Sequence, residues 1–395
     1  MKASIQTARE DFPITERVTY LASCGSSPLP KRVAEASKAY YDNRMVGDRL
    51  DLDTVFKKGK SEAAKLINAR EDEIAFVKGT TEGINTVASM MDYRPGDNIV
   101  LADVEFTSNV YPWMRAAKHE NLELRVVKSR NDGIWPEDYE KLVNDHTRVV
   151  AISDVQMANG FKCDLKEISR IAHSHGAYLA VDVIQSAGTM QVDSRNPEFD
   201  FMVAGSHKWL LGPSGMGFLF VRRDLIERFE PVFIGPWQED FVYSAPIDFT
   251  FRPYKLSTTA RRFELGGHPN IPGVIGFVEA LTYINEIGKE NIERKNMKLF
   301  ELVIENIERQ GLSIPDWATQ PGYRSSYIGY KSSQGVREVK EKAEKNGVVI
   351  APSRTILGDR VRIAPHFFCS EEEVVRAVEV LGQIERGVQI TPAVA

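Results

Sequence analysis

The chain has 395 residues, 43% of them hydrophobic and 27% charged, so it is long enough for roughly two domains and too apolar to be disordered. Lysine and arginine number 50, and aspartate and glutamate number 55, which gives a formal net charge of −5. The chain thus lacks the basic excess on which nucleic-acid and membrane-surface binders rely. We therefore expect a small-molecule substrate, with no nucleic-acid and no membrane partner.

The cellular compartment is predicted from the amino-terminal residues and the cysteines. The first twenty residues mix charged and apolar side chains, and no stretch approaches the roughly 20 apolar residues of a membrane span. Cys24, Cys163 and Cys369 are far apart in sequence, which favours neither a disulfide framework nor a metal site. We expect a cytoplasmic protein with reduced thiols and no bound metal.

Between about residues 60 and 225, short apolar runs alternate with helical stretches, a rhythm that predicts βαβ units and a largely parallel sheet. The expected strands are Glu73–Val77, Asn98–Ala102, Glu123–Val127, Thr147–Asp154, Tyr178–Asp182, Phe201–Ala204 and Gly217–Val221. The expected helices between them are Thr81–Met91, Val110–His119, Asp164–His175 and Ile184–Gly188.

The rest of the chain predicts a connection, long helices and a smaller α+β unit. Residues 235–272 are rich in proline, glycine and aromatic residues and favour an irregular connection. Apolar residues at helical spacing predict one or two long helices from Pro272 to Gln310. Strands at Tyr327–Tyr330, Val348–Ile350 and Val361–Ala364, and helices at about Gly335–Asn346 and Ser370–Arg386, are then expected.

A lysine among small residues is the first candidate site. Lys208 lies in the segment Val203–Gly217, after an apolar strand and before a glycine-rich turn. Burial lowers the pKa of a lysine and makes its amine a nucleophile that can form a Schiff base. A surface lysine beside the turn is the alternative.

A carboxylate follows the strand that precedes this lysine. Asp182, in the segment Ala180–Gln185, is expected at the carboxyl end of a buried strand. A buried carboxylate needs a cationic or protonated partner, and a pyridinium nitrogen is such a partner. As an alternative, Asp182 is the N-cap of the next helix.

A third motif, Val77–Asn85, joins an apolar strand to a helix through Gly79, Thr80 and Thr81. The glycine permits close backbone approach, and the first-turn amides of a helix attract a phosphate. Alternatively, Thr80 or Thr81 is an ordinary helix cap.

Together these motifs resemble the class V aminotransferase family of pyridoxal-phosphate enzymes, a fold-type I group that includes cysteine desulfurases, isopenicillin-N-epimerase-like proteins and kynureninases. The resemblance covers nearly the whole chain, from Tyr20–Pro30 to the last helix. It implies pyridoxal 5′-phosphate as cofactor and an α/β fold with a mostly parallel mixed sheet. It also implies a large cofactor-binding domain over residues 20–275 and a small α+β domain over residues 276–395, on which residues 1–19 pack.

The resemblance assigns cofactor-binding roles by position. Lys208 matches the lysine that forms the aldimine and moves protons at the substrate α-carbon. Asp182 matches the partner of the pyridine nitrogen, and Gln185 the residue that hydrogen-bonds the phenolic oxygen of the ring. Thr81 and the amide of Thr80 match the phosphate-binding turn.

Further positions are assigned in the same way. Ser206 and His207 are expected to complete the phosphate site. Arg362 matches the arginine that binds the substrate carboxylate, a role suited to its planar guanidinium. An interdomain salt bridge is the alternative for Arg362. The nearby Arg354 is a second candidate substrate-binding residue.

Departures from the desulfurases bear on the reaction. Phe106 stands where they have a histidine, so it can stack on the pyridine ring but cannot transfer a proton, and Met157 replaces an asparagine near the phenolic oxygen. The connection Ile350–Arg360 is short and lacks the persulfide-forming cysteine of their mobile loop. We expect Cys369 to be a packing residue, and Cys24 to be an ordinary small residue or part of the substrate pocket.

The resemblance therefore implies an enzyme that acts on the amino-acid portion of a small substrate. We rank a lyase-type reaction, either C–S cleavage or β-elimination, ahead of transamination and of epimerisation or racemisation. A cysteine desulfurase and a cofactor-binding relative without turnover rank below these. The family also implies a homodimer, and Pro236–Gln238 is our candidate for the segment that completes the partner's site.

Overall fold

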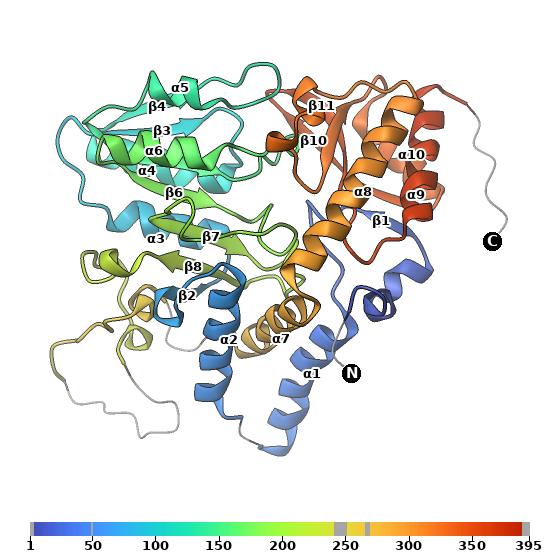
Figure 1. Cartoon of the computed structure of the whole chain (residues 1–395). Helices are drawn as coiled ribbons and strands as arrows, with labels where there is room; N and C mark the ends of the chain where they lie inside the picture. The colour runs from blue at the N-terminus through green and yellow to red at the C-terminus, as the bar shows by residue number, and fades with distance from the viewer. Residues whose placement is uncertain (1–3, 49, 241–250, 265–268, 389–395) are drawn as a thin grey trace.

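The computed structural model describes residues 4–48, 50–240, 251–264 and 269–388. Two sheets organise the described chain (Figure 1). The larger sheet has seven strands in the order β2-β8-β7-β6-β5-β3-β4, and the smaller has four in the order β1-β10-β11-β9.

The large sheet is mixed and mostly parallel, as predicted. Its strands are β2 (Ile74–Val77), β3 (Asn98–Ala102), β4 (Glu123–Val127), β5 (Thr147–Ser153), β6 (Tyr178–Asp182), β7 (Phe201–Gly205) and β8 (Gly217–Val221). Neighbours from β4 through β7 are parallel, whereas β8 pairs antiparallel with both β7 and β2. Most of these strands are buried along their full length, because helices cover both faces of the sheet.

Helices form a layer on each face. On one face α3 (Thr80–Met90) and α4 (Tyr111–Glu120) pack through residues such as Ile84, Val87 and Trp113. On the other face lie α2 (Leu52–Leu66), α6 (Leu165–Ser174) and α7 (Ile271–Ile287), with α1 (Lys31–Val46) against α7. Helices α1, α2 and the single-turn α5 (Pro136–Glu140) were not predicted from the sequence. The reason is clear for α1, where Val33 is the single buried residue and the apolar period is weak.

The predicted helix Ile184–Gly188 is wrong. Residues 184–186 form a turn, and Ala187 makes an isolated bridge with Met190. The Asp182 carboxylate accepts the Ile184 N–H at 2.9 Å, which starts a tight turn and not a helix. Gly188 takes a left-handed φ of 95°, and a Cβ there would overlap the Trp209 carbonyl.

The small sheet contains β1 (Thr19–Leu21), β9 (Ile328–Lys331), β10 (Val348–Thr355) and β11 (Gly358–Ile363). The expected long helices are two, α7 and α8 (Lys289–Arg309), and they meet at Gly288. Together with α9 (Val336–Lys345) and α10 (Glu371–Glu385), α8 lies beside the small sheet (Figure 1). The domain boundary at 275/276 stays a prediction and falls inside α7.

The amino-terminal segment packs on the small sheet. Strand β1 pairs parallel with β10, and the Phe12 ring stacks on Phe368 with 4.1 Å between centroids. Arg9 forms an ion pair with Glu373 at 2.6 Å. No helix of the described residues combines the length and apolar character needed to cross a bilayer.

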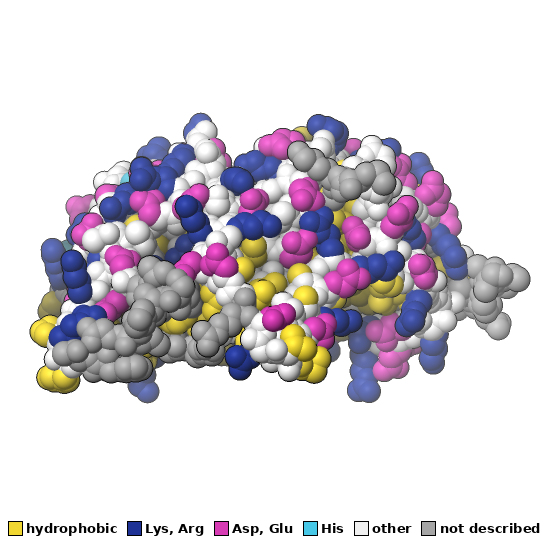
Figure 2. Space-filling view, turned by 90° about the horizontal axis from the view of Figure 1, so that it is seen from below, with side chains coloured by type: hydrophobic (Ala, Val, Ile, Leu, Met, Phe, Trp, Pro, Cys, Tyr) yellow, Lys and Arg dark blue, Asp and Glu magenta, His cyan; other side chains and the backbone are white. Residues whose placement is uncertain are grey.

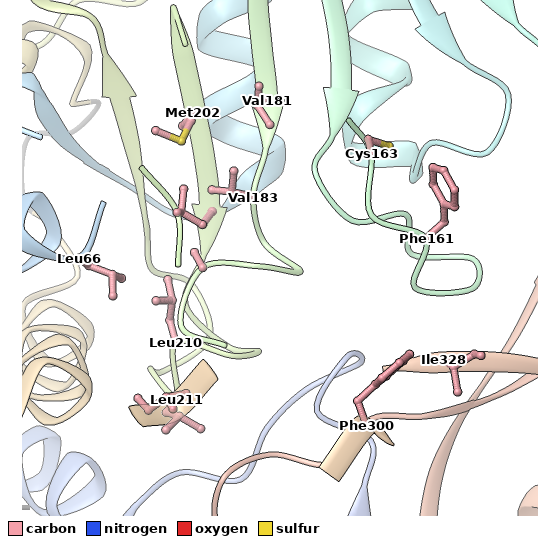
Figure 3. Close-up of a cluster of buried hydrophobic side chains, with 14 of the residues drawn as sticks. Leu66, Phe161, Cys163, Val181, Val183, Met202, Leu210, Leu211, Phe300 and Ile328 are labelled. Atoms are coloured by element: carbon pink, nitrogen blue, oxygen red, sulfur yellow. The ribbon is translucent and has the colours of Figure 1, made fainter. Parts of the chain in front are cut away.

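One hydrophobic core joins the two sheets. Figure 3 shows Val181 and Met202 from the large sheet, Phe161 from the loop after β5, and Phe300 and Ile328 from the small unit. All five belong to the same buried cluster. The two units are therefore packed together, and residues from both can form one site.

Candidate active site

The carboxyl ends of the strands meet at one edge of the large sheet. Gly217 of β8 pairs with Val77 on one side and Gly205 on the other, so β2 and β7 end at the same level. Asp182 at the end of β6 lies beside Ser153 of β5. Ligands of α/β proteins bind at such edges. A cavity of about 760 Å³ opens here, lined among others by Thr80, Thr81, Phe106, Asp182, Gln185, His207, Lys208 and Arg362.

The start of α3 provides a phosphate-sized set of donors. Gly79 is the N-cap residue, with a φ of 151° that favours glycine, and no side chain of the described residues caps the helix. Thr80 Oγ1 instead accepts the Gly205 N–H at 3.2 Å, which ties α3 to β7. The Thr81 and Ser108 hydroxyls lie 2.7 Å apart in the cavity wall. The helix-cap alternative is therefore wrong for both threonines, and the first-turn amides face the cavity edge.

Of the two residues expected to complete the phosphate site, the structure brings His207 alone to the cavity. Burial and the neighbouring Lys208 lower the pKa of the His207 ring, which favours its neutral form. Ser206 is fully buried, and its hydroxyl donates to the Pro213 carbonyl. Ser206 does not line the cavity, and its hydrogen bond instead stabilises the turn that follows Lys208.

Lys208 is the buried amine of the site. Its side chain is 8% exposed, and burial lowers its pKa to about 8. Its Nζ lies 5.8 Å from the centroid of the Phe106 ring. The surface-lysine alternative is therefore wrong, and the amine is prepared for nucleophilic and proton-transfer chemistry near neutral pH.

Asp182 is 2% exposed, and burial raises its pKa to about 7. Such a carboxyl ionises readily once a cationic partner enters the cavity. Gln185 also lines the cavity, and both ends of its amide are bonded: Nε2 donates to the Cys24 carbonyl, and Oε1 accepts from the Trp209 indole, each at 2.9 Å. Gln185 is therefore held rigidly beside Lys208.

The arginines of β10 and β11 have three different environments. Arg362 lines the cavity, donating from Nε to the Ala351 carbonyl at 3.0 Å and from Nη1 to the Met157 carbonyl at 3.1 Å. Arg360 forms the salt bridge between units, to Asp132 at 2.6 Å. Arg354 is exposed, pairs with Asp359 at 2.7 Å and does not line the cavity. The interdomain alternative thus applies to Arg360, and of the two candidates Arg362 alone is placed to meet a substrate.

The three cysteines are buried. Cys369 donates to the Tyr20 carbonyl at 3.3 Å, and burial raises its pKa to about 12, as expected for a packing residue. Cys24 lines the cavity, and burial raises its pKa, which keeps it a neutral thiol. Met157 also lines the cavity, and the Phe106 side chain there is 42% exposed.

Glu105 was not among the site residues predicted from the sequence. Its buried carboxylate accepts from the Ser153 amide at 2.7 Å, from Gln156 Nε2 at 2.7 Å and from Asn109 Nδ2 at 2.9 Å. It thereby holds Phe106 at the end of β5. Its position in the sequence could have indicated it, because Glu105 comes three residues after the buried strand that ends at Ala102. Asp182 was predicted from the same kind of position at the end of a strand.

Two of the three residues proposed to complete the partner's site, Trp237 and Gln238, are buried within their own chain, whereas Pro236 is exposed. Trp237 packs on Phe56, and the Gln238 amide donates to the carbonyls of Phe233 and Arg262 at 2.9 Å. The preceding Val232–Ile234 is exposed, and Figure 2 shows hydrophobic side chains gathered on the lower face of the molecule. The homodimer stays a prediction, but Trp237 and Gln238 are too buried to reach a partner subunit's site.

The donor set fits pyridoxal phosphate. An uncapped helix start with two hydroxyls suits a phosphate, a buried carboxyl suits a protonated pyridine nitrogen, and a buried amine suits an aldehyde. Each group lines one cavity at the carboxyl edge of the sheet. The fold and this site define a fold-type I pyridoxal-phosphate enzyme.

Comparisons with known proteins agree. The family model of aminotransferase class V matches residues 19–321. A probable cysteine desulfurase of Pyrococcus abyssi is 33% identical over 320 residues, 78% of this chain and 77% of that protein. The uncharacterized aminotransferase YcbU of Bacillus subtilis is 29% identical over 374 residues, 94% of this chain and 95% of that protein.

Among solved structures, the apo cysteine desulfurase of Thermococcus onnurineus NA1 superposes with a TM-score of 0.85 at 27% identity. The match covers 98% of this chain and 100% of that one. The chain belongs to the class V aminotransferase family. It is a pyridoxal-phosphate-dependent enzyme.

Proposed function

We propose that the chain is a lyase that removes a sulfur or other leaving group from Cβ of a small amino acid. One observation carries the proposal: a buried amine, Lys208, and a guanidinium, Arg362, face the same cavity, and Cys24 in its wall is a buried thiol. When bound, pyridoxal phosphate supplies an electron sink for the bonds at the substrate α-carbon.

Residues of the chain bind the substrate, transfer the proton and cover the site. Arg362 binds the substrate carboxylate, and Lys208 takes the proton from the α-carbon. Phe106 covers the site without offering a competing proton-transfer group. For a cysteine thioether, one water is consumed, and the products are the thiol, pyruvate and ammonia.

The cysteines support a lyase over a persulfide-forming desulfurase. All three are buried, and β10 and β11 are joined by Ile356 and Leu357 alone. A sulfur-accepting thiol on a mobile loop therefore has no counterpart between these strands. Cysteine desulfuration is nevertheless the second candidate, because relatives at about a third identity carry that name.

An amino-acid panel that distinguishes four reactions tests the proposal. We expect pyruvate and ammonia without an added acceptor, most strongly from cysteine and its thioethers. Formation of alanine from cysteine would favour desulfuration, and strict dependence on a keto acid would favour transamination. Loss of optical activity without pyruvate would favour epimerisation or racemisation. Each of the last three outcomes contradicts the lyase.

Replacing Arg362 with alanine is expected to lower kcat/KM roughly 10- to 100-fold, chiefly through KM, because charge-assisted hydrogen bonds contribute about 1.5–3 kcal/mol. Arg354→Ala is the matched control on the same hairpin, since its guanidinium is exposed and paired with Asp359. Steady-state kinetics with one amino acid checks both variants. Equal loss in the two would refute the assignment of Arg362 as carboxylate ligand.

A further inference from the structure

A buried histidine connects the strand of Arg362 to the turn of Lys208. His366 follows β11 and is fully buried. Its Nδ1 accepts the Phe367 N–H at 2.9 Å, so Nε2 carries the hydrogen and donates to the Trp209 carbonyl at 3.2 Å. Burial lowers the pKa of His366 to about 3, which keeps the ring neutral and this tautomer fixed at neutral pH.

Trp209, the residue after Lys208, is held at its carbonyl, at its indole ring and at its indole N–H. Gly188 approaches its carbonyl so closely that a Cβ would overlap that oxygen. Its indole packs on the His366 ring at 5.2 Å and on Tyr327 at 6.1 Å between centroids. The indole N–H donates to Gln185 at 2.9 Å. A shift of His366 must therefore reach the backbone next to Lys208.

The segment from Arg362 to His366 is also fixed by backbone hydrogen bonds. Only Ile363, Ala364 and Pro365 separate Arg362 from His366. Ala364 donates to the Leu21 carbonyl at 2.9 Å and accepts the Ser23 N–H at 3.2 Å. His366 and Arg362 therefore belong to one bonded segment of the small unit, while Lys208 follows β7 of the large sheet.

We propose that His366 is a positioning residue that sets the placement of the Lys208 amine relative to the Arg362 guanidinium through the Trp209 carbonyl. The two functional groups come from different units, and misplacement of reacting groups by about 1 Å can cost 10²-fold in rate. A neutral donor held between rigid partners supplies that precision without adding a charge to the cavity. The inference rests on the proposed function, because it assumes that Lys208 and Arg362 act on one substrate.

Two variants of the holoenzyme separate positioning from packing. His366→Leu removes the donor, whereas His366→Gln retains an N–H near the position of Nε2. We expect H366L to lower kcat about 10- to 100-fold with little change in KM, and to shift the pH midpoint of the visible absorbance of the lysine-bound cofactor. H366Q is expected to restore both readouts to near the wild-type values.

A matched control lies at the opposite edge of the sheet. His173 contacts Asp200, which precedes β7, at 2.8 Å, and His173→Leu is expected to lower the melting temperature without moving kcat or the absorbance midpoint. If H366L does not fold, His366→Met replaces it as the donor-free variant, because methionine fills more of the volume of the histidine side chain.

The proposal is overturned if the donor-free variant changes the melting temperature alone, or if H366Q is as impaired as that variant. Absence of amino-acid turnover in the wild-type enzyme would instead defeat the proposed function. The absorbance midpoint would in that case still test His366, because it requires no substrate.

Discussion

Replacing Lys208 with alanine is expected to lower kcat/KM by roughly 10²- to 10⁴-fold, the usual contribution of a positioned proton-transfer group. The side chain is buried, its pKa is lowered to about 8, and it faces the same cavity as Arg362. Alanine removes both the amine that binds the cofactor and the base at the α-carbon. Visible absorbance of the purified protein and initial rates measure the two losses separately.

Lys78→Ala is the control, because Lys78 is the other lysine among the cavity residues. Its side chain is 70% exposed and pairs with Glu82 at 3.6 Å. We expect its rate to stay within about threefold of wild type, as for an exposed ion pair. Retention of the absorbance band and of turnover in K208A would refute the assignment of Lys208.

Burial of the Lys208 amine is also expected to lower the free energy of unfolding of the protein. Because burial lowers the pKa of Lys208 from 10.5 to about 8, the unfolded chain binds a proton between these pH values that the native chain does not. Stability of the cofactor-free protein therefore rises with pH across this window. Lys208→Met should flatten that slope and raise the free energy of unfolding at pH 7 by as much as about 3 kcal/mol, measured by urea unfolding.

Replacing Asp182 with asparagine is expected to lower kcat by at least about a hundredfold, because loss of one partner of a buried ion pair costs about 3–5 kcal/mol. The asparagine fills the same volume and can accept the Ile184 N–H that Asp182 accepts at 2.9 Å. It cannot supply the negative charge that keeps a pyridine nitrogen protonated. Single-turnover kinetics of the cofactor-loaded variant tests the chemical step directly.

Asp154→Asn provides a closely matched control. Asp154 is also a buried carboxyl with a raised pKa at this edge of the sheet, and its N–H donates to the Asp182 carbonyl at 3.0 Å. It lines a different cavity, together with Lys162 and Cys163. We expect D154N to change kcat by less than about threefold whatever its effect on stability. Equal losses in the two variants would show that burial of charge, and not contact with the cofactor, explains the effect at Asp182.

The strands were predictable because their signal is local. Continuous apolar runs such as Tyr178–Asp182 and Gly217–Val221 are typical of strands covered on both faces, and their bounds are those found. The helix expected at Ile184–Gly188 failed for an equally physical reason. The Asp182 carboxylate takes the Ile184 N–H, and Gly188 must pass against the Trp209 carbonyl.

The sequence by itself determined the kinds of groups at the strand ends: a glycine-rich helix start, a carboxylate and a lysine in fixed chain order. Only the tertiary structure decided how the neighbouring arginines divide their roles, with Arg362 at the cavity, Arg360 between the units and Arg354 in solvent. It also decided that Ser206 faces its own turn and that His366 reaches Trp209. The direction of such side chains depends on partners that lie tens to hundreds of residues away or on a turn that forms only on folding, and no local pattern encodes them.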